Sequence, residues 1–214
     1  MSTQITIPRT SFSSDDINLL FLPPRRQLSA IEVFETSRTR LADAKLALTN
    51  MFDGFVKHLP ADGLPFLLVP PQPKAVNQMD WNELMARIRL NGKVGRNYLS
   101  VSALKDLDPM VSVPRMLVDI EDGRGRLNIK PSVSESNIVA GKRFGYTLWT
   151  GYIHAVVFTE VLSHHYMDLV RSRYDSDLVP FLFLDDVAPA LRARWNGDAN
   201  PKWGAPSFGS VVEG

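Results

Sequence analysis

Residues 178–195, which read LVPFLFLDDVAPALRARW, decide the fold of this chain. The first part, Leu178–Leu184, is apolar around a proline near its start, which is typical of a buried strand. Leu191–Trp195 alternates apolar residues with arginines, and this period of two indicates a strand with its two arginines on the face opposite Trp195. Residues 185–189 between them are rich in the Asp and Pro that turns favour. The stretch therefore predicts a β-hairpin.

Shorter strands are expected upstream of this hairpin. Pro65–Pro70 is an apolar run between prolines and is typical of a buried strand. Residues 98–104 alternate loosely and form a further candidate. Residues 116–120 and 126–130 flank a stretch with two glycines, and glycine accepts the positive φ that hairpin turns need. These two segments therefore predict a second hairpin.

Three helix starts carry a capping box, in which a Ser or Asp and a Glu three residues later satisfy each other's free backbone N–H groups. The expected helices run from Ser29 and Glu32 to about His58, from Asp80 and Glu83 to Leu90, and from Ser132 and Glu135 to Ala140. A fourth helix is predicted over Thr150–Ser163 from apolar residues at helical spacing.

The first of these helices is long, because its apolar stripe continues from Ile31 to Leu59 and ends at Pro60. Residues 1–28, rich in Ser, Thr and Pro, are typical of an arm. We therefore expect three parts: an arm over 1–28, a long helix over 29–60, and an α+β domain over 61–214. The predicted fold class is α+β, with a long N-terminal helix followed by a mixed, largely antiparallel sheet with short helices.

Composition excludes several classes of protein. The chain has 214 residues, 44% of them hydrophobic, which is enough for a sizeable core. It contains no cysteine, and this excludes disulfides, thiolate zinc sites, iron–sulfur clusters and thiol nucleophiles. The net charge of +1 argues against dedicated nucleic-acid binding, which needs a strong positive field. No apolar stretch approaches the ~20 residues that span a bilayer and no signal peptide is recognised, so we expect no membrane partner and a cytoplasmic location.

Several catalytic signatures are absent from the sequence. It has no Gly-x-Ser-x-Gly elbow, no HExxH motif, no Walker motif and no dinucleotide fingerprint, and it indicates no particular cofactor. Gly92-Lys93-Val94-Gly95 is similar to the GxxG clamp of single-strand RNA binders. A solvated basic helix end explains this segment equally well.

A candidate metal or acid–base site is the pair His164-His165 followed by Asp168. If the helix continued past Ser163, His164 and Asp168 would share one face at a four-residue spacing, which can bind a divalent metal or pair a base with the group that orients it. Two histidines and one carboxylate rarely suffice without further ligands. The alternative is a helix C-terminus, where the helix dipole and free carbonyls favour histidine.

A candidate ligand-binding surface lies in two polar segments around the hairpin. The arginines of residues 171–177 could hold a carboxylate or phosphate through paired hydrogen bonds, or could brace a turn. Residues 195–207 carry two tryptophans on a Gly- and Pro-rich loop, which could form a stacking floor for a sugar, a base or a cation, or could cap the core. The predicted ligand-binding residues are Arg173, Tyr174, Trp195, Asp198, Asn200 and Trp203.

The C-terminal third also carries a spaced pattern. Its positions are Tyr146-Thr147, Ser172-Arg173, Val179-Pro180, Pro189 with Leu191, Trp195 with Gly197 and Asn200, Trp203-Gly204 and Ser207, preceded by Pro65-Phe66, Pro114 through Asp119, Gly123 and Pro131. This pattern resembles a bacterial, largely actinobacterial, domain family of unknown function, over roughly residues 65–212. The chain departs from it at Phe208, where the family often has a cysteine. The resemblance implies a shared C-terminal pattern and no particular activity.

Three functional hypotheses follow. The preferred one is a binding or interaction domain with a ligand or partner surface near the C-terminal Trp and Arg loops, because loops carry function more often than core segments. The second is a metal-assisted hydrolase-like enzyme that uses His164, His165 and Asp168. The third is a structural or oligomeric subunit in which residues 1–60 mediate assembly of a homo-oligomer. Whether the chain is an enzyme stays open at this point.

Overall fold

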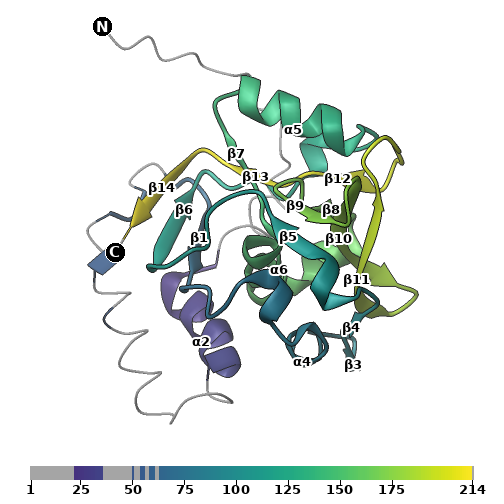
Figure 1. Ribbon diagram of the computed structural model, residues 1–214. Coiled ribbons are helices and arrows are strands. Elements are labelled where there is room, and N and C mark those ends of the chain that lie inside the picture. The colour runs from purple at the N-terminus through teal and green to yellow at the C-terminus, as the bar shows by residue number, and fades with distance from the viewer. Residues whose placement is uncertain (1–21, 36–49, 51–53, 56–57, 61–62, 214) are drawn as a thin grey trace, which may run out of the picture.

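The computed structural model describes residues 22–35, 50, 54–55, 58–60 and 63–213, whose helices and strands are shown in Figure 1. The helices of this part of the chain are α2 (Pro24–Glu35), η1 (Val76–Gln78), α4 (Trp81–Met85), η2 (Val101–Ala103), η3 (Arg124–Arg126), α5 (Pro131–Ala140), α6 (Leu148–Val157) and η4 (Thr159–Ser163), where η marks a 3₁₀ helix. The strands are β1 (Phe66–Val69), β2 (Arg89–Leu90), β3 (Lys93–Val94), β4 (Arg96–Asn97), β5 (Leu104–Asp106), β6 (Arg115–Val118), β7 (Phe144–Gly145), β8 (Tyr166–Asp168), β9 (Ser172–Tyr174), β10 (Leu178–Asp185), β11 (Ala188–Trp195), β12 (Trp203–Gly204), β13 (Ser207–Phe208) and β14 (Ser210–Glu213).

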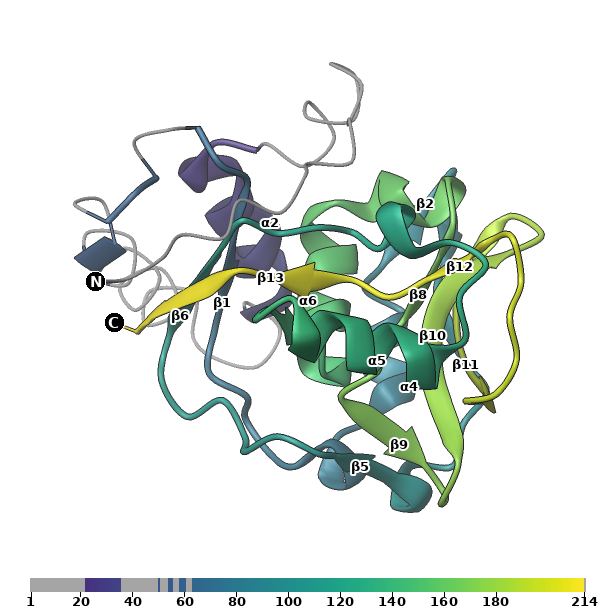
Figure 2. The same cartoon turned by 90° about the horizontal axis from the view of Figure 1, so that it is seen from above.

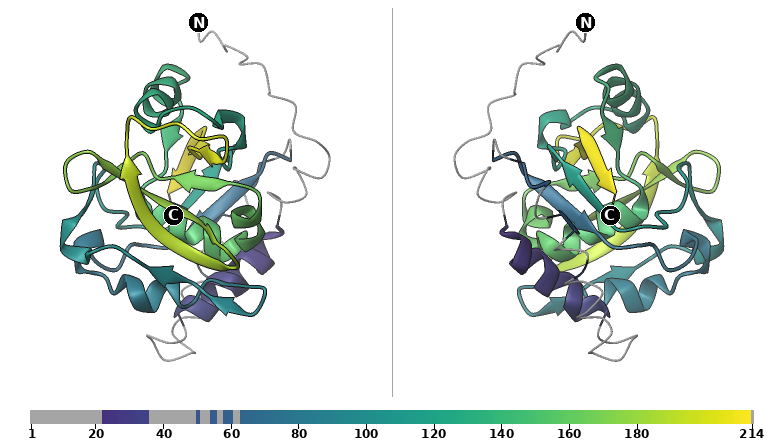
Figure 3. Two further views of the ribbon diagram at one scale, coloured as in Figure 1. Left: turned by 90° about the vertical axis from the view of Figure 1, so that its right-hand side faces the viewer. Right: turned by 90° about the vertical axis from the view of Figure 1, so that its left-hand side faces the viewer.

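The predicted C-terminal hairpin is confirmed and forms the centre of the largest sheet. β10 and β11 pair antiparallel along their whole length, from Leu178 opposite Trp195 to Asp185 opposite Ala188. Asp186 at the turn has a φ of 56°, a left-handed conformation that Asp tolerates in tight hairpins. The strand order is β12-β8-β10-β11-β4, with β9 and β5 attached off this path. The sheet curls into a half-barrel (Figure 3).

A second, three-stranded sheet has the order β1-β6-β14 and is antiparallel. The strand predicted between the two prolines of Pro65–Pro70 is confirmed as β1. The second predicted hairpin is wrong, because β6 pairs with β1 and β14 and the segment that was expected to pair with it begins in η3. The cause is local. The Asp122 carboxylate accepts both the backbone N–H and the Nε–H of Arg124, and such short-range bonds compete with a ladder between strands.

Helix α6 lies at the centre of the core. Residues 148–155 are all buried, and the helix packs against β10, β1 and α2 (Figure 2). The helix predicted over Thr150–Ser163 is present in its first half, but Thr147 caps it earlier and η4 replaces it after Val157. The polar tips of two buried aromatic side chains have partners, since Trp149 Nε1 donates to the Pro70 carbonyl at 3.0 Å and Tyr152 Oη to the Leu84 carbonyl at 3.1 Å.

The predicted fold class is wrong in its main feature, the long N-terminal helix. Helix α2 begins at Pro24 and has 12 residues, and residues 50, 54 and 55 are the other described helical positions before residue 60. Proline suits the first turn of a helix, where its missing N–H costs nothing, so the Pro-Pro pair begins the helix and Ser29 lies inside it. The boundary predicted at residue 28 therefore falls within α2, and residues 1–21 and 36–49 lie outside the described residues. The described fold consists of short helices around several sheets.

Gln27 fixes α2 to the outer edge of β1. Its side chain is completely buried, and its Nε2 donates to the Phe66 carbonyl at 2.9 Å and to the Leu22 carbonyl at 3.1 Å. Its Oε1 accepts the Leu68 N–H at 3.0 Å. The amide thus occupies the place of a neighbouring strand and provides partners for the backbone at this edge.

Three further helix and strand predictions are only partly confirmed. Asp80 caps α4 as predicted, but the helix ends at Met85, and the last two residues of the predicted helix form β2, the first strand of the β2–β3 hairpin. The reason is Asn91-Gly92, which has φ values of 51° and 75° and forms the tip of that hairpin. Residues 98–104 hold η2 and only the first residue of β5. Helix α5 ends at Ala140 as predicted and begins at Pro131. No helix of the described ranges is long and apolar enough to cross a membrane.

Candidate functional site

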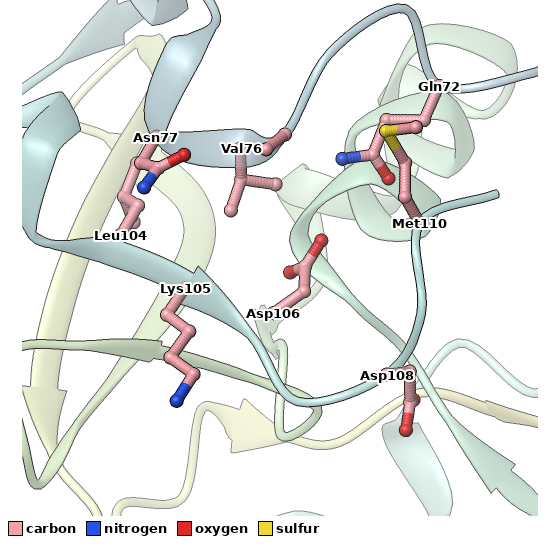
Figure 4. Close-up of a pocket in the computed structure, with 9 residues that line it drawn as sticks. Gln72, Val76, Asn77, Leu104, Lys105, Asp106, Asp108 and Met110 are labelled. Atoms are coloured by element: carbon pink, nitrogen blue, oxygen red, sulfur yellow. The ribbon is translucent and has the colours of Figure 1, made fainter. Parts of the chain in front are cut away.

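A cavity of about 190 Å³ opens beside the end of β5. It is lined by Gln72, Ala75, Val76, Asn77, Leu104, Lys105, Asp106, Asp108 and Met110. Figure 4 shows that the Asp106 carboxylate points into the space between Val76 and Gln72, while the side chains of Lys105 and Asp108 point away from it. The cavity is therefore lined by apolar and polar side chains, and one carboxylate points into it. Its volume is smaller than the roughly 300–1,000 Å³ of sites for drug-sized molecules.

Strand pairing and the start of α6 fix the position of Asp106. It is the last residue of β5 and lies opposite Ser172 of β9. The Ser172 hydroxyl donates to Asp106 Oδ1 and accepts the Leu148 N–H at 2.7 Å. Ser172 itself is completely buried. A strand, its neighbour and a helix N-terminus thus hold the carboxylate in one orientation.

The environment of Asp106 brings its proton exchange close to neutral pH. Burial raises the pKa of the Asp106 carboxyl to about 6, and the nearby Asp108 carboxylate adds to this rise. Hydrogen bonds from Ser172, from the Leu148 N–H and from Gln72 lower the pKa and offset part of the effect. An unperturbed aspartate is fully ionised well below this pH. Asp106 therefore exchanges its proton in a range where a bound charge can alter its state.

The neighbouring carboxylate, Asp108, is neutralised by the fold. Its two oxygens accept from Arg171, with Nε at 3.1 Å from each oxygen and Nη2 at 2.6 Å from Oδ1. Arg171 also donates to Glu135 at 2.6 Å, and Glu135 accepts from Arg173 at 2.7 Å. The hydrogen bonds with Asp108 are the main cause that raises the pKa of Arg171 above its ordinary value. Both arginines of the polar segment 171–177 thus bind carboxylates of their own chain.

Arginine neutralises most carboxylates that the fold buries or half-buries. The pairs are Asp108 with Arg171, Asp119 with Arg143, Glu121 with Arg126, Asp122 with Arg124, Glu135 with Arg173 and Asp168 with Arg194. Asp106 differs from all of these, because it forms no ion pair with any residue that the structure describes. The carboxylate in the cavity is the exception to a general pattern.

The predicted C-terminal ligand surface is divided between the two faces of the sheet. Arg194, which the prediction omitted, donates to both oxygens of Asp168 at 2.9 and 2.6 Å and to the Asp198 carbonyl at 2.6 Å. Its guanidinium lies 3.6 Å from the centre of the Trp203 ring. Neighbouring residues of a strand point to opposite faces, so Trp195 lies on the face opposite Arg194. The two indoles therefore do not form one stacking floor.

The other residues of that surface have separate places. The Trp195 side chain is 55% exposed, at the end of β11. Asn200 Oδ1 accepts the Lys202 N–H at 2.9 Å and braces the loop. Tyr174, in β9, packs partly buried against the main core. Trp195 is the predicted residue that keeps a large aromatic surface open to solvent.

The three residues of the predicted metal or acid–base site do not share a helix face. The expected helix does not reach them, since Asp168 lies in β8 and His164 follows η4. His165 Nε2 lies 2.7 Å from the Asp122 carbonyl, and the Asp168 carboxylate is bound by Arg194. Burial lowers the pKa of His165, and His154 upstream is buried against the Tyr146 hydroxyl at 3.1 Å. Among the described residues no three His, Asp or Glu side chains are grouped to hold a metal ion.

Asp106 was not among the residues predicted from the sequence, although the sequence carries a signal for it. Asp106 and Asp108 follow directly on residues 98–104, which were expected to form a strand, and polar residues after a strand end are natural candidates for a site. Gln72 offers no such signal, because it comes to the cavity from a loop more than 30 residues upstream. Comparisons of the chain with models of protein families, with curated proteins and with solved structures found no match. The resemblance over residues 65–212 therefore stays a prediction.

Proposed function

We propose that this chain is a binding domain that holds a small ligand in the cavity beside Asp106. One observation carries the proposal. Arginines neutralise the other carboxylates that the described fold buries or half-buries. The carboxylate that points into the cavity forms no ion pair with a described residue, and the neighbouring Lys105 side chain points away from it. A buried charge is costly unless it is paired, so a carboxylate held in this way gains from a ligand that completes its partners.

Binding fits the lining of the cavity better than a reaction does. Ser172 is the hydroxyl nearest to Asp106, but it is completely buried and already both donates and accepts a hydrogen bond. A serine nucleophile needs an adjacent base that removes its proton and a free path to the substrate. The cavity lining otherwise contains amide, carboxylate, ammonium and apolar side chains, which suit recognition.

The C-terminal loops are a less favourable place for the ligand. Their arginines bind carboxylates of the same chain, and the Trp203 ring is covered by Arg194. Trp195 remains exposed, so a contact of this side chain with a partner is compatible with the proposal. The charge pattern nonetheless favours the cavity as the primary site.

A matched pair of substitutions tests the location. Ala75 is exposed and lines the cavity, so Ala75→Phe should fill the opening without disturbing the core. Ala199→Phe places the same side chain on the exposed C-terminal loop and serves as the control. Both proteins and the unsubstituted protein are screened against small fragments by ligand-observed NMR, and bound fragments are located from amide chemical shifts.

We expect fragments that shift the amide signals of Gln72 and Leu104–Asp106 to bind the unsubstituted protein and Ala199→Phe, and to lose binding in Ala75→Phe. Binding that survives in Ala75→Phe would contradict the proposal, as would a screen without any binding fragment. Loss of binding in Ala199→Phe alone would place the ligand on the C-terminal loop instead.

A further inference from the structure

We infer that the cavity recognises an alkylammonium group, that is, a primary amine cation on a short apolar chain. This inference rests on the proposed function and names the class of ligand for the same site. It is carried by three features of the cavity: its charge, the hydrogen-bond acceptors that remain open, and its size and apolar walls.

The negative charge in the cavity favours a ligand with a single positive charge. The Asp106 carboxylate is the charged group that points inward, while Lys105 points away and Asp108 is bound by Arg171 (Figure 4). No cation of the described residues forms an ion pair with Asp106. A neutral ligand would leave this charge unpaired, and an anion would be repelled. A monocation matches it.

The open acceptors favour an ammonium over a guanidinium. A guanidinium binds a carboxylate best through both oxygens at once, but the Asp106 carboxylate already accepts from Ser172, from the Leu148 N–H and from Gln72. An ammonium is a compact charge with three donors, so a single lone pair that these bonds leave on the carboxylate is enough for it. Gln72 lies beside Asp106, and because its Nε2 donates to the Lys74 carbonyl at 2.9 Å, its Oε1 is the atom left to accept from a ligand.

The remaining walls fit a short hydrocarbon chain. Val76 and Leu104 are buried and Met110 is 46% exposed at the opening, so apolar surface surrounds the path from the carboxylate to solvent. The volume of about 190 Å³ equals roughly six water molecules at their share of liquid volume. A chain of a few methylene groups with a terminal ammonium fits this space, and a whole nucleotide does not.

Such a ligand comes from one of two sources, a free amine or the lysine side chain of a partner protein. Butylammonium represents the free amine, and N-acetyl-lysine-N-methylamide represents the side chain. 1-Butanol has the same shape without the charge, and ethylguanidinium carries the charge with a forked donor group. Dissociation constants are measured for the full chain by NMR titration at pH 7.5, and again at pH 5.

We expect butylammonium or the lysine derivative to bind at least tenfold more tightly than 1-butanol and ethylguanidinium, and the tighter of the two identifies the source. Asp106→Asn should lose this preference. It keeps an oxygen that accepts from Ser172, so it is expected to fold. Asp186→Asn removes a carboxylate from the hairpin turn at a φ that Asn also tolerates, and it should bind as the unsubstituted protein does.

The pH dependence provides a test that needs no variant. Because the pKa of Asp106 is about 6, its carboxylate is almost fully ionised at pH 7.5 and about one-tenth ionised at pH 5. An ammonium that requires the ionised form therefore binds about tenfold more weakly at pH 5. The affinity of 1-butanol should change little over the same range.

Two outcomes separate this inference from the proposed function. If 1-butanol binds as tightly as butylammonium and Ala75→Phe abolishes both, the cavity is a ligand site without charge recognition, and only the inference is overturned. If no probe and no fragment binds, both the inference and the proposed function are overturned. Butylammonium binding that persists in Asp106→Asn, or that is equally tight at pH 5, also overturns the inference.

Discussion

Replacement of Arg194 by methionine should lower the free energy of unfolding by about 3–5 kcal/mol. The Arg194 guanidinium binds both oxygens of Asp168, and the two side chains are only 5% and 1% exposed. The same group donates to the Asp198 carbonyl and covers the Trp203 ring. Methionine keeps most of the apolar stem of arginine but is shorter and lacks the charge and every donor.

The magnitude follows from what the substitution leaves behind. Asp168 becomes a buried carboxylate without a cation, and removal of one partner from a buried ion pair typically costs about 3–5 kcal/mol. For a chain of this size each kcal/mol lowers Tm by about 2–4 °C, so Tm should fall by about 6–20 °C. Burial already raises the pKa of Asp168 in the presence of Arg194, so the variant should raise it further. A carboxyl whose folded pKa is raised favours folding at low pH, and the variant should regain part of its stability as the pH falls.

Urea unfolding followed by circular dichroism at pH 7 and pH 5 measures these changes. The matched control is Arg192→Met, two residues away on the same strand, whose ion pair with Asp185 is exposed and should be worth less than about 1 kcal/mol. The double substitution Arg194→Met with Asp168→Leu should be more stable than Arg194→Met alone, because both charges are removed. A loss below about 1 kcal/mol in Arg194→Met, or a double variant no more stable than the single one, would refute this reasoning.

Three further predictions concern the core. Gln27→Leu should lower the free energy of unfolding by about 2–4 kcal/mol in urea unfolding, because the Leu68 N–H loses its acceptor and the Phe66 carbonyl loses its donor from Gln27. An unchanged urea midpoint would show that these backbone groups of β1 do not depend on Gln27 for their hydrogen bonds. Gly151→Ala should lower Tm although alanine favours helices, because the added methyl group overlaps Leu169, at a cost of about 1–3 kcal/mol; a rise in Tm would contradict this. Burial lowers the pKa of His154 to about 4. Between pH 6.5 and pH 4 this histidine is therefore protonated in the unfolded chain but neutral in the folded chain. The contribution of neutral His154 to the free energy of unfolding is fully present above pH 6.5 and is lost as the pH falls to 4, by about 3 kcal/mol in total. His154→Gln should therefore reduce the slope of the free energy of unfolding against pH in this window.

The parts of the fold that the sequence predicted are those with short-range causes. The β10–β11 hairpin joins two strands through a two-residue turn, so its alternation, its apolar run and its Asp-rich link all lie within 18 residues. The cap of α4 by Asp80 is local as well. The prediction of a long helix was wrong because it relied on the apolar spacing after Ile31 and placed the prolines outside the helix. Pro24 is in fact the first residue of α2. A periodic pattern shows where a helix can form, and the start depends on single residues.

The site could not be found in this way, because its parts meet only through tertiary contacts. Asp106 and Ser172 are 66 residues apart in the chain, and they meet because β5 pairs with β9. Neither strand has more than three residues, and such short strands carry no detectable period. The pairing of Arg171 with Asp108 spans 63 residues and is equally hidden. A sequence of net charge +1 gives no indication of which carboxylate these pairings leave without a cation.

These pairings reverse the charge expected of the ligand. The arginines of residues 171–177 were expected either to hold a carboxylate or phosphate ligand or to brace a turn, and the structure gives them carboxylate partners within the chain. The carboxylates belong to the chain itself, since Arg171 and Arg173 bind Glu135 and Arg194 binds Asp168. Guanidinium groups that are already bound in pairs have little left to offer an anion. Among the carboxylates that the described residues bury or half-bury, the one without a cation is then Asp106, so we expect a ligand recognised through charge in the cavity to be a cation.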